Sequence, residues 1–153
     1  SDVYKRQPVG RPMSVEREIF PLLAGDGVLF AMGSDCYWID AGTPSTYLTS
    51  NLDFVRHTGE GIHPEAFVDP ASSVSNSVVG PRASVAAGAS IERSVVLDGA
   101  TIGEKAKVEG SIVGPGADIA AGASVVGLSV VGPGAKVEVG ECVDGIRRSR
   151  LEG

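Results

Sequence analysis

The sequence predicts a mainly β protein, in which a column of about five stacked coils follows a smaller α/β segment. Glycine makes up 21 of the 153 residues, about twice its ordinary share, which favours a turn-rich fold. The aromatic residues, 4 Phe, 3 Tyr and 1 Trp, lie almost entirely in the first part of the chain, and only Phe67 lies beyond Phe54. The second part also repeats itself at a fixed interval. We therefore place a border between two kinds of structure near residue 59.

The repeat is read directly from the letters after Ser77. Successive copies are SVVGPRASVAAGASIER, SVVLDGATIGEKAKVEG, SIVGPGADIAAGASVVGL and SVVGPGAKVEVGECVDG, with 17, 17, 18 and 17 residues. The preceding stretch EGIHPEAFVDPASSVSN falls into the same frame. The sequence therefore contains five copies, which span residues 60–145.

A finer period of six residues runs through each copy. Aliphatic residues recur at steps of six, six and five, with a six in place of the five where Leu128 has been added, and a small residue follows most of them four positions later. This spacing lacks the i, i+3, i+4 pattern of a helix, and it predicts a short strand and a tight turn three times per coil. The predicted inward aliphatic positions are Val79, Val85, Ile91, Val96, Ile102, Val108, Val113, Ile119, Val125, Val131, Val137 and Val143.

This hexapeptide pattern resembles the left-handed parallel β-helix, a triangular prism of stacked coils. The left hand comes from the resemblance, because ordinary parallel crossovers are right-handed. One coil cannot cover its own apolar face, so stacking supplies the burial, at about 1.5 to 3 kcal/mol for each inward Val or Ile. Glu141 takes a position where the other coils have Ala, so we expect the column to fray near its end.

Helices are expected at two places before the repeats. Ser14 can cap a helix whose first turn contains Glu16, and Pro21 is expected to split or end that helix. Thr43 followed by Pro44 is typical of a helix start, and this second helix should run to about Arg56.

Between the two helices, the sequence predicts two strands. Residues 28–32 and 36–39 are rich in β-forming side chains and are joined by a Gly-Ser-Asp turn. Trp38, in the second strand, is expected to lie in a core. The predicted divisions of the chain are therefore a non-native or disordered start over 1–11, an α/β segment over 12–59, the coils over 60–145 and a tail over 146–153.

Charge and cysteine content limit the class of protein. The net charge of -6 lacks the basic face that nucleic-acid binding needs, so no nucleic-acid partner is expected. No run of 18 apolar residues and no signal peptide are present, which favours a soluble, cytoplasmic protein without a membrane partner. Cys36 and Cys142 lie far apart, as expected for free thiols in a reducing compartment.

The segment before the coils resembles the end of the catalytic domain of sugar-1-phosphate nucleotidyltransferases. The resemblance rests on SVEREIFPLLAGDGVLFAM, on YWIDAGTPSTYLTSNLDFV with its W-x-D-x-G-T-P core, and on the hexapeptides that follow. It covers roughly residues 12–145 and is closest to the mannose-1-phosphate guanylyltransferases. It implies the C-terminal fragment of an enzyme that makes GDP-mannose from mannose-1-phosphate and GTP, with the β-helix serving oligomerisation, as a homo-oligomer, or regulation.

The resemblance also implies one metal ligand. In the family, the Asp of this motif helps to hold Mg²⁺, and the matching residue is Asp40; a carboxylate suits such a hard cation. The alternative is that Asp40 only caps the following helix or its turn. The family's nucleotide loop, G-x-G-T-R-L-x-P-L-T, its downstream Lys and its second metal Asp have no counterpart here. We therefore assign no catalytic or nucleotide-binding residue and expect the fragment to be inactive by itself.

Two other functions stay open. One is a free-standing interaction or scaffold module built on the β-helix. The other is a hexapeptide acyltransferase, for which His63 would have to be the catalytic histidine, although a surface position beside Pro64 is the simpler interpretation. A three-histidine metal site of the γ-carbonic anhydrase kind is excluded, because only His57 and His63 exist.

Overall fold

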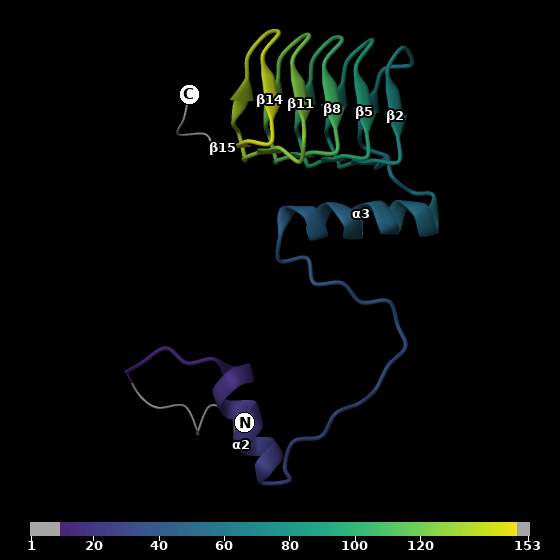
Figure 1. The fold of residues 1–153 in the computed structure, drawn as a ribbon. Helices are drawn as coiled ribbons and strands as arrows, with labels where there is room; N and C mark the ends of the chain where they lie inside the picture. Colours follow the sequence, from purple (N-terminus) through teal and green to yellow (C-terminus); the bar gives the residue numbers. More distant parts are fainter. Residues whose placement is uncertain (1–9, 150–153) are drawn as a thin grey trace. The chain divides into compact units, whose positions relative to one another are not determined.

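A computed structural model describes residues 10–149, which belong to two compact units divided between Trp38 and Ile39 (Figure 1). The second unit contains the coils, which wind into a parallel β-helix with three sides. The predicted fold class, a mainly β protein with a left-handed β-helix of about five coils, is confirmed.

Each side of the β-helix is a five-stranded parallel sheet. Sheet 1 contains β1 (Phe67–Val68), β4 (Ser84–Val85), β7 (Thr101–Ile102), β10 (Asp118–Ile119) and β13 (Lys136–Val137). Sheet 2 contains β2 (Ser73–Ser75), β5 (Ser90–Glu92), β8 (Lys107–Glu109), β11 (Ser124–Val126) and β14 (Cys142–Asp144). Sheet 3 contains β3 (Val78–Val79), β6 (Val95–Val96), β9 (Ile112–Val113), β12 (Val130–Val131) and β15 (Arg147–Arg148).

The strand register reproduces the sequence repeat. Val85 pairs with Ile102 one 17-residue coil later, whereas Ile119 pairs with Val137 across the longer coil. The additional residue lies in the turn after β11, where Leu128 adopts a φ of 62°. Because the insertion sits in a turn, the strands on both sides keep their inward and outward faces.

The core of the β-helix is the one predicted. Every aliphatic position expected to face inward is at most 1% exposed, and the small residues between them are buried as well. The glycines between strands serve two purposes. Gly116 adopts a φ of +62°, whereas a Cβ on Gly114 would come within 2.7 Å of the Val131 carbonyl oxygen of the next coil.

Helix α3 (Pro44–Thr58) belongs to the same unit as the β-helix and confirms the second predicted helix. Thr43 and Thr46 form a capping box at its start, and Gly59 ends it with a φ of 73°. In Figure 1, α3 runs alongside the stacked coils.

The first unit is only partly as predicted. Ser14 accepts a hydrogen bond from the Arg17 N–H and caps the π-helical turn η1 (Val15–Ile19). Helix α2 (Phe20–Gly25) follows directly, with Pro21 in its first turn, where a proline is tolerated. The backbone stays helical through Ile19 and Phe20, so the expectation that Pro21 splits or ends the helix is wrong, and the helix only changes from π to α geometry there. None of the helices in residues 10–149 has the length and apolar content needed to span a bilayer.

The two strands predicted over 28–32 and 36–39 are wrong, because both segments are irregular. Phe30, Met32 and Trp38 are 88%, 93% and 79% exposed, so the expected core position of Trp38 is wrong as well. The reason is physical: two short strands are marginal in water unless further strands or a helix cover them. Within residues 10–149, every strand pairs only inside the β-helix.

The expected fraying at Glu141 is also wrong. Strand β14 follows directly, and β15 carries sheet 3 on to Arg148, past the predicted limit at 145. Glu141 is held in an ion pair with Arg148, which compensates for the carboxylate at an alanine position.

Candidate functional site

Asp40 lies just before α3, and its carboxylate is exposed. Its Oδ1 accepts a hydrogen bond from the N–H of Gly42 at 2.9 Å, the bond that defines an Asx turn. A Cβ on Gly42 would lie 3.1 Å from this same oxygen, so a side chain at position 42 would crowd the carboxylate. The turn role that was the alternative for Asp40 is therefore present in the structure.

The cap of α3 is made by threonines. The Thr43 Oγ1 accepts a bond from the Thr46 N–H at 3.2 Å, and the Thr46 Oγ1 accepts one from the Thr43 N–H at 3.1 Å. The N–H groups of Thr43 and Thr46 are both satisfied in this way, so Asp40 is not required as the N-cap.

Asp40 alone does not make a metal site. Among residues 10–149, no three His, Cys, Asp or Glu side chains gather where a metal ion could be held. Mg²⁺ is commonly bound by one or two protein carboxylates together with water and substrate phosphates. Asp40 fits as one such ligand within a larger shared site, and its place in a magnesium shell stays a prediction.

The two histidines take part in local hydrogen bonds. His63 Nδ1 accepts from the Glu65 N–H at 3.1 Å, and His57 Nδ1 lies 2.7 Å from the carbonyl oxygen of Asp53 one helical turn earlier. Both residues are exposed. Neither arrangement orients an imidazole toward a nucleophile, so the geometry does not favour the acyltransferase alternative.

The outer face of sheet 3 is apolar, and α3 packs against it. Leu48 and Leu52 of the helix are 9% and 8% exposed and join Val95 and Ile112 of the sheet in one buried cluster. This contact between α3 and sheet 3 was not among the sequence predictions, although the sequence contains a pattern that indicates it. The third strand of the coils has two consecutive aliphatic residues, as in Val95-Val96, so one must face outward and needs a cover.

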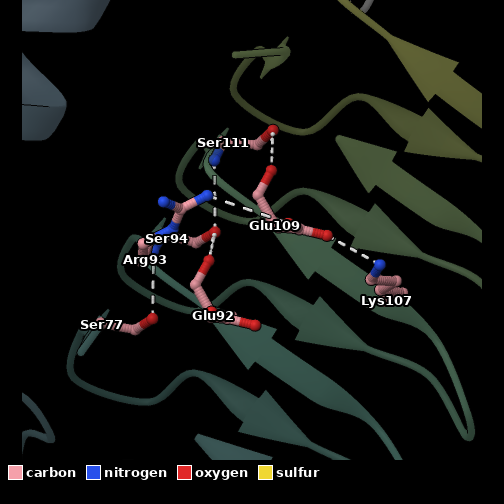
Figure 2. A network of polar contacts seen from close by, with 7 residues as sticks. All are labelled: Ser77, Glu92, Arg93, Ser94, Lys107, Glu109 and Ser111. Atoms are coloured by element: carbon pink, nitrogen blue, oxygen red, sulfur yellow. Dashed lines mark hydrogen bonds and ion pairs between the residues drawn. The ribbon is translucent and has the colours of Figure 1, made fainter. Parts of the chain in front are cut away.

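A ladder of buried serines joins the coils where sheet 2 turns into sheet 3 (Figure 2). Ser94 and Ser111 each donate their N–H to the serine hydroxyl of the coil before, at 3.0 and 3.2 Å. The hydroxyls in turn donate to carbonyl oxygens, as Ser94 does to Glu92 at 2.7 Å. In the sequence, the ladder is indicated by the serine that begins each copy of the repeat. The buried members are Ser77, Ser94, Ser111 and Ser129.

Charged side chains lie on the surface beside this ladder. Lys107 Nζ is 2.7 Å and Arg93 Nη2 is 3.8 Å from the carboxylate of Glu109 (Figure 2). The hydrogen bond from Lys107 holds the pKa of Glu109 below its ordinary value and raises the pKa of Lys107. These groups are solvated, so they contribute little to stability. The ladder and its charged border therefore serve the fold and supply no catalytic arrangement.

The family comparison matches the part of the chain that contains the coils. A family described as "GMPPB C-terminal domain" matches residues 59–147. A mannose-1-phosphate guanylyltransferase of Mycobacterium tuberculosis is 36% identical over 112 residues, which cover 64% of this chain and 31% of the relative. A mannose-1-phosphate guanylyltransferase catalytic subunit beta of Xenopus tropicalis is 34% identical over 77 residues, covering 44% and 21% of the two chains. The chain thus spans about a third or less of these relatives.

Solved structures show a weaker likeness. Serine acetyltransferase 1 of Entamoeba histolytica covers 62% of this chain and 40% of its own, with a TM-score of 0.39 and 16% identity. A perosamine N-acetyltransferase of Caulobacter crescentus covers 82% of this chain and 69% of its own, with a TM-score of 0.36 and 21% identity. Likenesses at this level carry no argument about activity.

Proposed function

Since the chain belongs to the family of the GMPPB C-terminal domain, we propose that it is the C-terminal part of a mannose-1-phosphate guanylyltransferase. The 36% identity to the Mycobacterium tuberculosis enzyme is the observation that carries this proposal. The family match covers the β-helix, over residues 59–147, and α3 (Pro44–Thr58) lies directly before it.

The proposed reaction of the whole enzyme is a nucleotidyl transfer. A phosphate oxygen of mannose-1-phosphate attacks the α-phosphorus of GTP, the bond from that phosphorus to the bridging oxygen breaks, and GDP-mannose and pyrophosphate form. Bound Mg²⁺ would neutralise the charge that accumulates on the phosphates. Asp40 is the one residue of this chain that we assign to the magnesium shell, and its Asx turn with Gly42 orients the carboxylate.

The test uses the full-length enzyme that contains this chain. Asp40→Asn should lower kcat by about 100-fold or more and weaken the dependence on Mg²⁺, because a charged ligand is lost where charge develops. Asp35→Asn, an exposed carboxylate in the same segment, is the matched control and should leave both unchanged. Wild-type turnover and Mg²⁺ dependence in Asp40→Asn would remove this residue from the proposal.

The 153-residue chain by itself should bind neither GTP nor mannose-1-phosphate. One carboxylate without a phosphate-binding loop offers too few contacts to hold a nucleotide and its metal together. Isothermal titration with GTP and Mg²⁺ should therefore show no heat of binding. Micromolar binding would mean that these residues contain a nucleotide site of their own.

For the β-helix, we propose a role in homo-oligomerisation or regulation of the enzyme. Helix α3 covers sheet 3, whereas the outer surfaces of sheets 1 and 2 carry exposed side chains such as Phe67, which is 62% exposed. Light scattering during gel filtration should show that deletion of the β-helix lowers the oligomeric mass of the full enzyme. We also expect action in the cytoplasm, which suits two free and exposed cysteines.

A further inference from the structure

The last coil places two charged residues where earlier coils have buried apolar ones. Arg148 pairs in register with Val131, and Cys142 pairs with Ser124, so Glu141 takes the position that Ala123 has one coil before. Val131 and Ala123 are both 0% exposed. By register, Arg148 and Glu141 therefore occupy inward-facing positions of the last coil.

These two side chains form a close bidentate ion pair. Arg148 Nη2 lies 2.5 Å from Glu141 Oε1, and Nη1 lies 2.8 Å from Oε2. The side chains are 26% and 29% exposed, so the pair is more protected from solvent than the other ion pairs of the coils. The guanidinium, together with the N–H of Glu138, holds the pKa of Glu141 below its ordinary value. The pair is therefore charged at neutral pH.

The pair also takes up two backbone groups at the last edge of sheet 1. In each earlier coil, the residue after the inward one donates its N–H to the following coil, as Ala120 does to Val137 at 2.9 Å. Glu138 is the same position in the last strand of sheet 1, and its N–H donates to Glu141 Oε2 at 2.9 Å. The Lys136 carbonyl on that strand accepts from Arg148 Nη1 at 3.1 Å. The ion pair thus replaces contacts that a further coil would supply.

The two ends of the column differ in cover. Val137 and Val143 of the last coil are each only 1% exposed. Their strands, β13 and β14, are nevertheless the last strands of sheets 1 and 2 in the described part of the chain, so no further coil stacks on them there. At the other end, Val68 and Val74 of the first coil are only partly buried, and β1 and β2 each have one neighbouring strand. The first coil thus retains an open strand edge, which is a place for pairing with another chain.

We propose that Glu141 and Arg148 form an end cap that prevents the last coil from pairing with the first coil of a second copy of this chain. Such a head-to-tail contact would repeat without closing and would lead to filaments. Stacking onto the capped end would bury both charges and displace their bonds to Glu138 and Lys136, which is costly.

The test replaces the cap by the residues of the preceding coil in the 153-residue chain. Glu141→Ala with Arg148→Val should give species larger than those of the wild type, in a proportion that rises with concentration in sedimentation velocity. Arg82→Gln with Asp98→Asn removes a 2.5 Å ion pair from the side of the column and is the matched control, which should sediment like the wild type.

Two further measurements separate capping from a loss of folding. Circular dichroism should show that the capless variant retains its β content, and if it does not, Glu141→Gln with Arg148→Met, which keeps the side-chain lengths, takes its place. Hydrogen exchange at the Glu138 N–H should be faster in Glu141→Ala alone, because its acceptor is gone. A folded capless variant with the size distribution of the wild type at every concentration would overturn the proposal.

Discussion

The β-helix and the segment over residues 28–39 begin from similar residues and reach opposite structures. Both contain short aliphatic runs with strand propensity, such as Val95-Val96 in the coils and Val28-Leu29-Phe30 in the segment. In the coils, β6 pairs with a strand on each side, and Val96 is 0% exposed. In the segment, Phe30 is 88% exposed and no strand forms. The difference shows that strands of two or three residues depend on stacked neighbours and not on local propensity.

The largest expected effect breaks this stacking at its centre. Val113→Asp places a carboxylate with no partner in a position that is 0% exposed. The cost should be about 5 kcal/mol or more, comparable with the whole stability of a small domain. Circular dichroism should show loss of the cooperative thermal transition of the β-helix. Thr101→Asn, at an exposed position of β7, is the control and should melt like the wild type, because it adds no charge beside Asp118 of the neighbouring strand.

This contrast explains how much of the fold could be predicted. The inward positions of the β-helix follow from a period that every coil repeats. If one copy departs from the pattern, the other copies still show which of its residues face inward. Residues 28–39 have no such repetition, and their structure depends on which strands are available to pair with them. Asp40 is intermediate: its turn follows from local chemistry with Gly42, whereas the proposed metal role would need further ligands, and no three His, Cys, Asp or Glu side chains gather into a metal site among residues 10–149.

The ends of the coils illustrate the same limit. The alanine pattern correctly identified Glu141 as an exception, but the frequency of one residue cannot show which partner compensates for it. That partner, Arg148, lies beyond the last full repeat and pairs through the register of β15. Glu141 and Arg148 both depart from the repeat, and only the three-dimensional structure shows that they pair with each other.

A smaller effect is expected where α3 covers sheet 3. Leu52→Ala should destabilise the β-helix unit by about 2 to 4 kcal/mol, because it removes buried methyl groups between the helix and Ile112. Chemical unfolding monitored by circular dichroism measures the change. Phe54→Ala on the same helix is the control, since that side chain is 54% exposed. Equal losses in both variants would mean that the contact of Leu52 with sheet 3 contributes no more than a half-exposed side chain of α3, because alanine favours the helix in both variants.

Each hydrogen bond of the serine ladder should contribute less to the free energy of unfolding than Leu52 does. Ser94→Ala leaves the buried N–H of Ser111 without its hydroxyl acceptor, at a cost of about 1 to 2 kcal/mol. The outward-facing Ser90→Ala should be near neutral. If the ladder acts as described, hydrogen exchange at the Ser111 N–H will be faster in Ser94→Ala and unchanged in Ser90→Ala.

The smallest effect should occur in the irregular segment over residues 28–39. Trp38→Ser and Met32→Ser should leave the melting temperature of the β-helix unchanged, because both side chains are almost fully exposed and lie in the other compact unit. Differential scanning calorimetry of the 153-residue chain provides the measurement. In the proposed full-length enzyme, the same substitutions should be destabilising if further strands pair with residues 28–39. Equal neutrality in both contexts would show that Trp38 and Met32 are exposed in the longer protein as well.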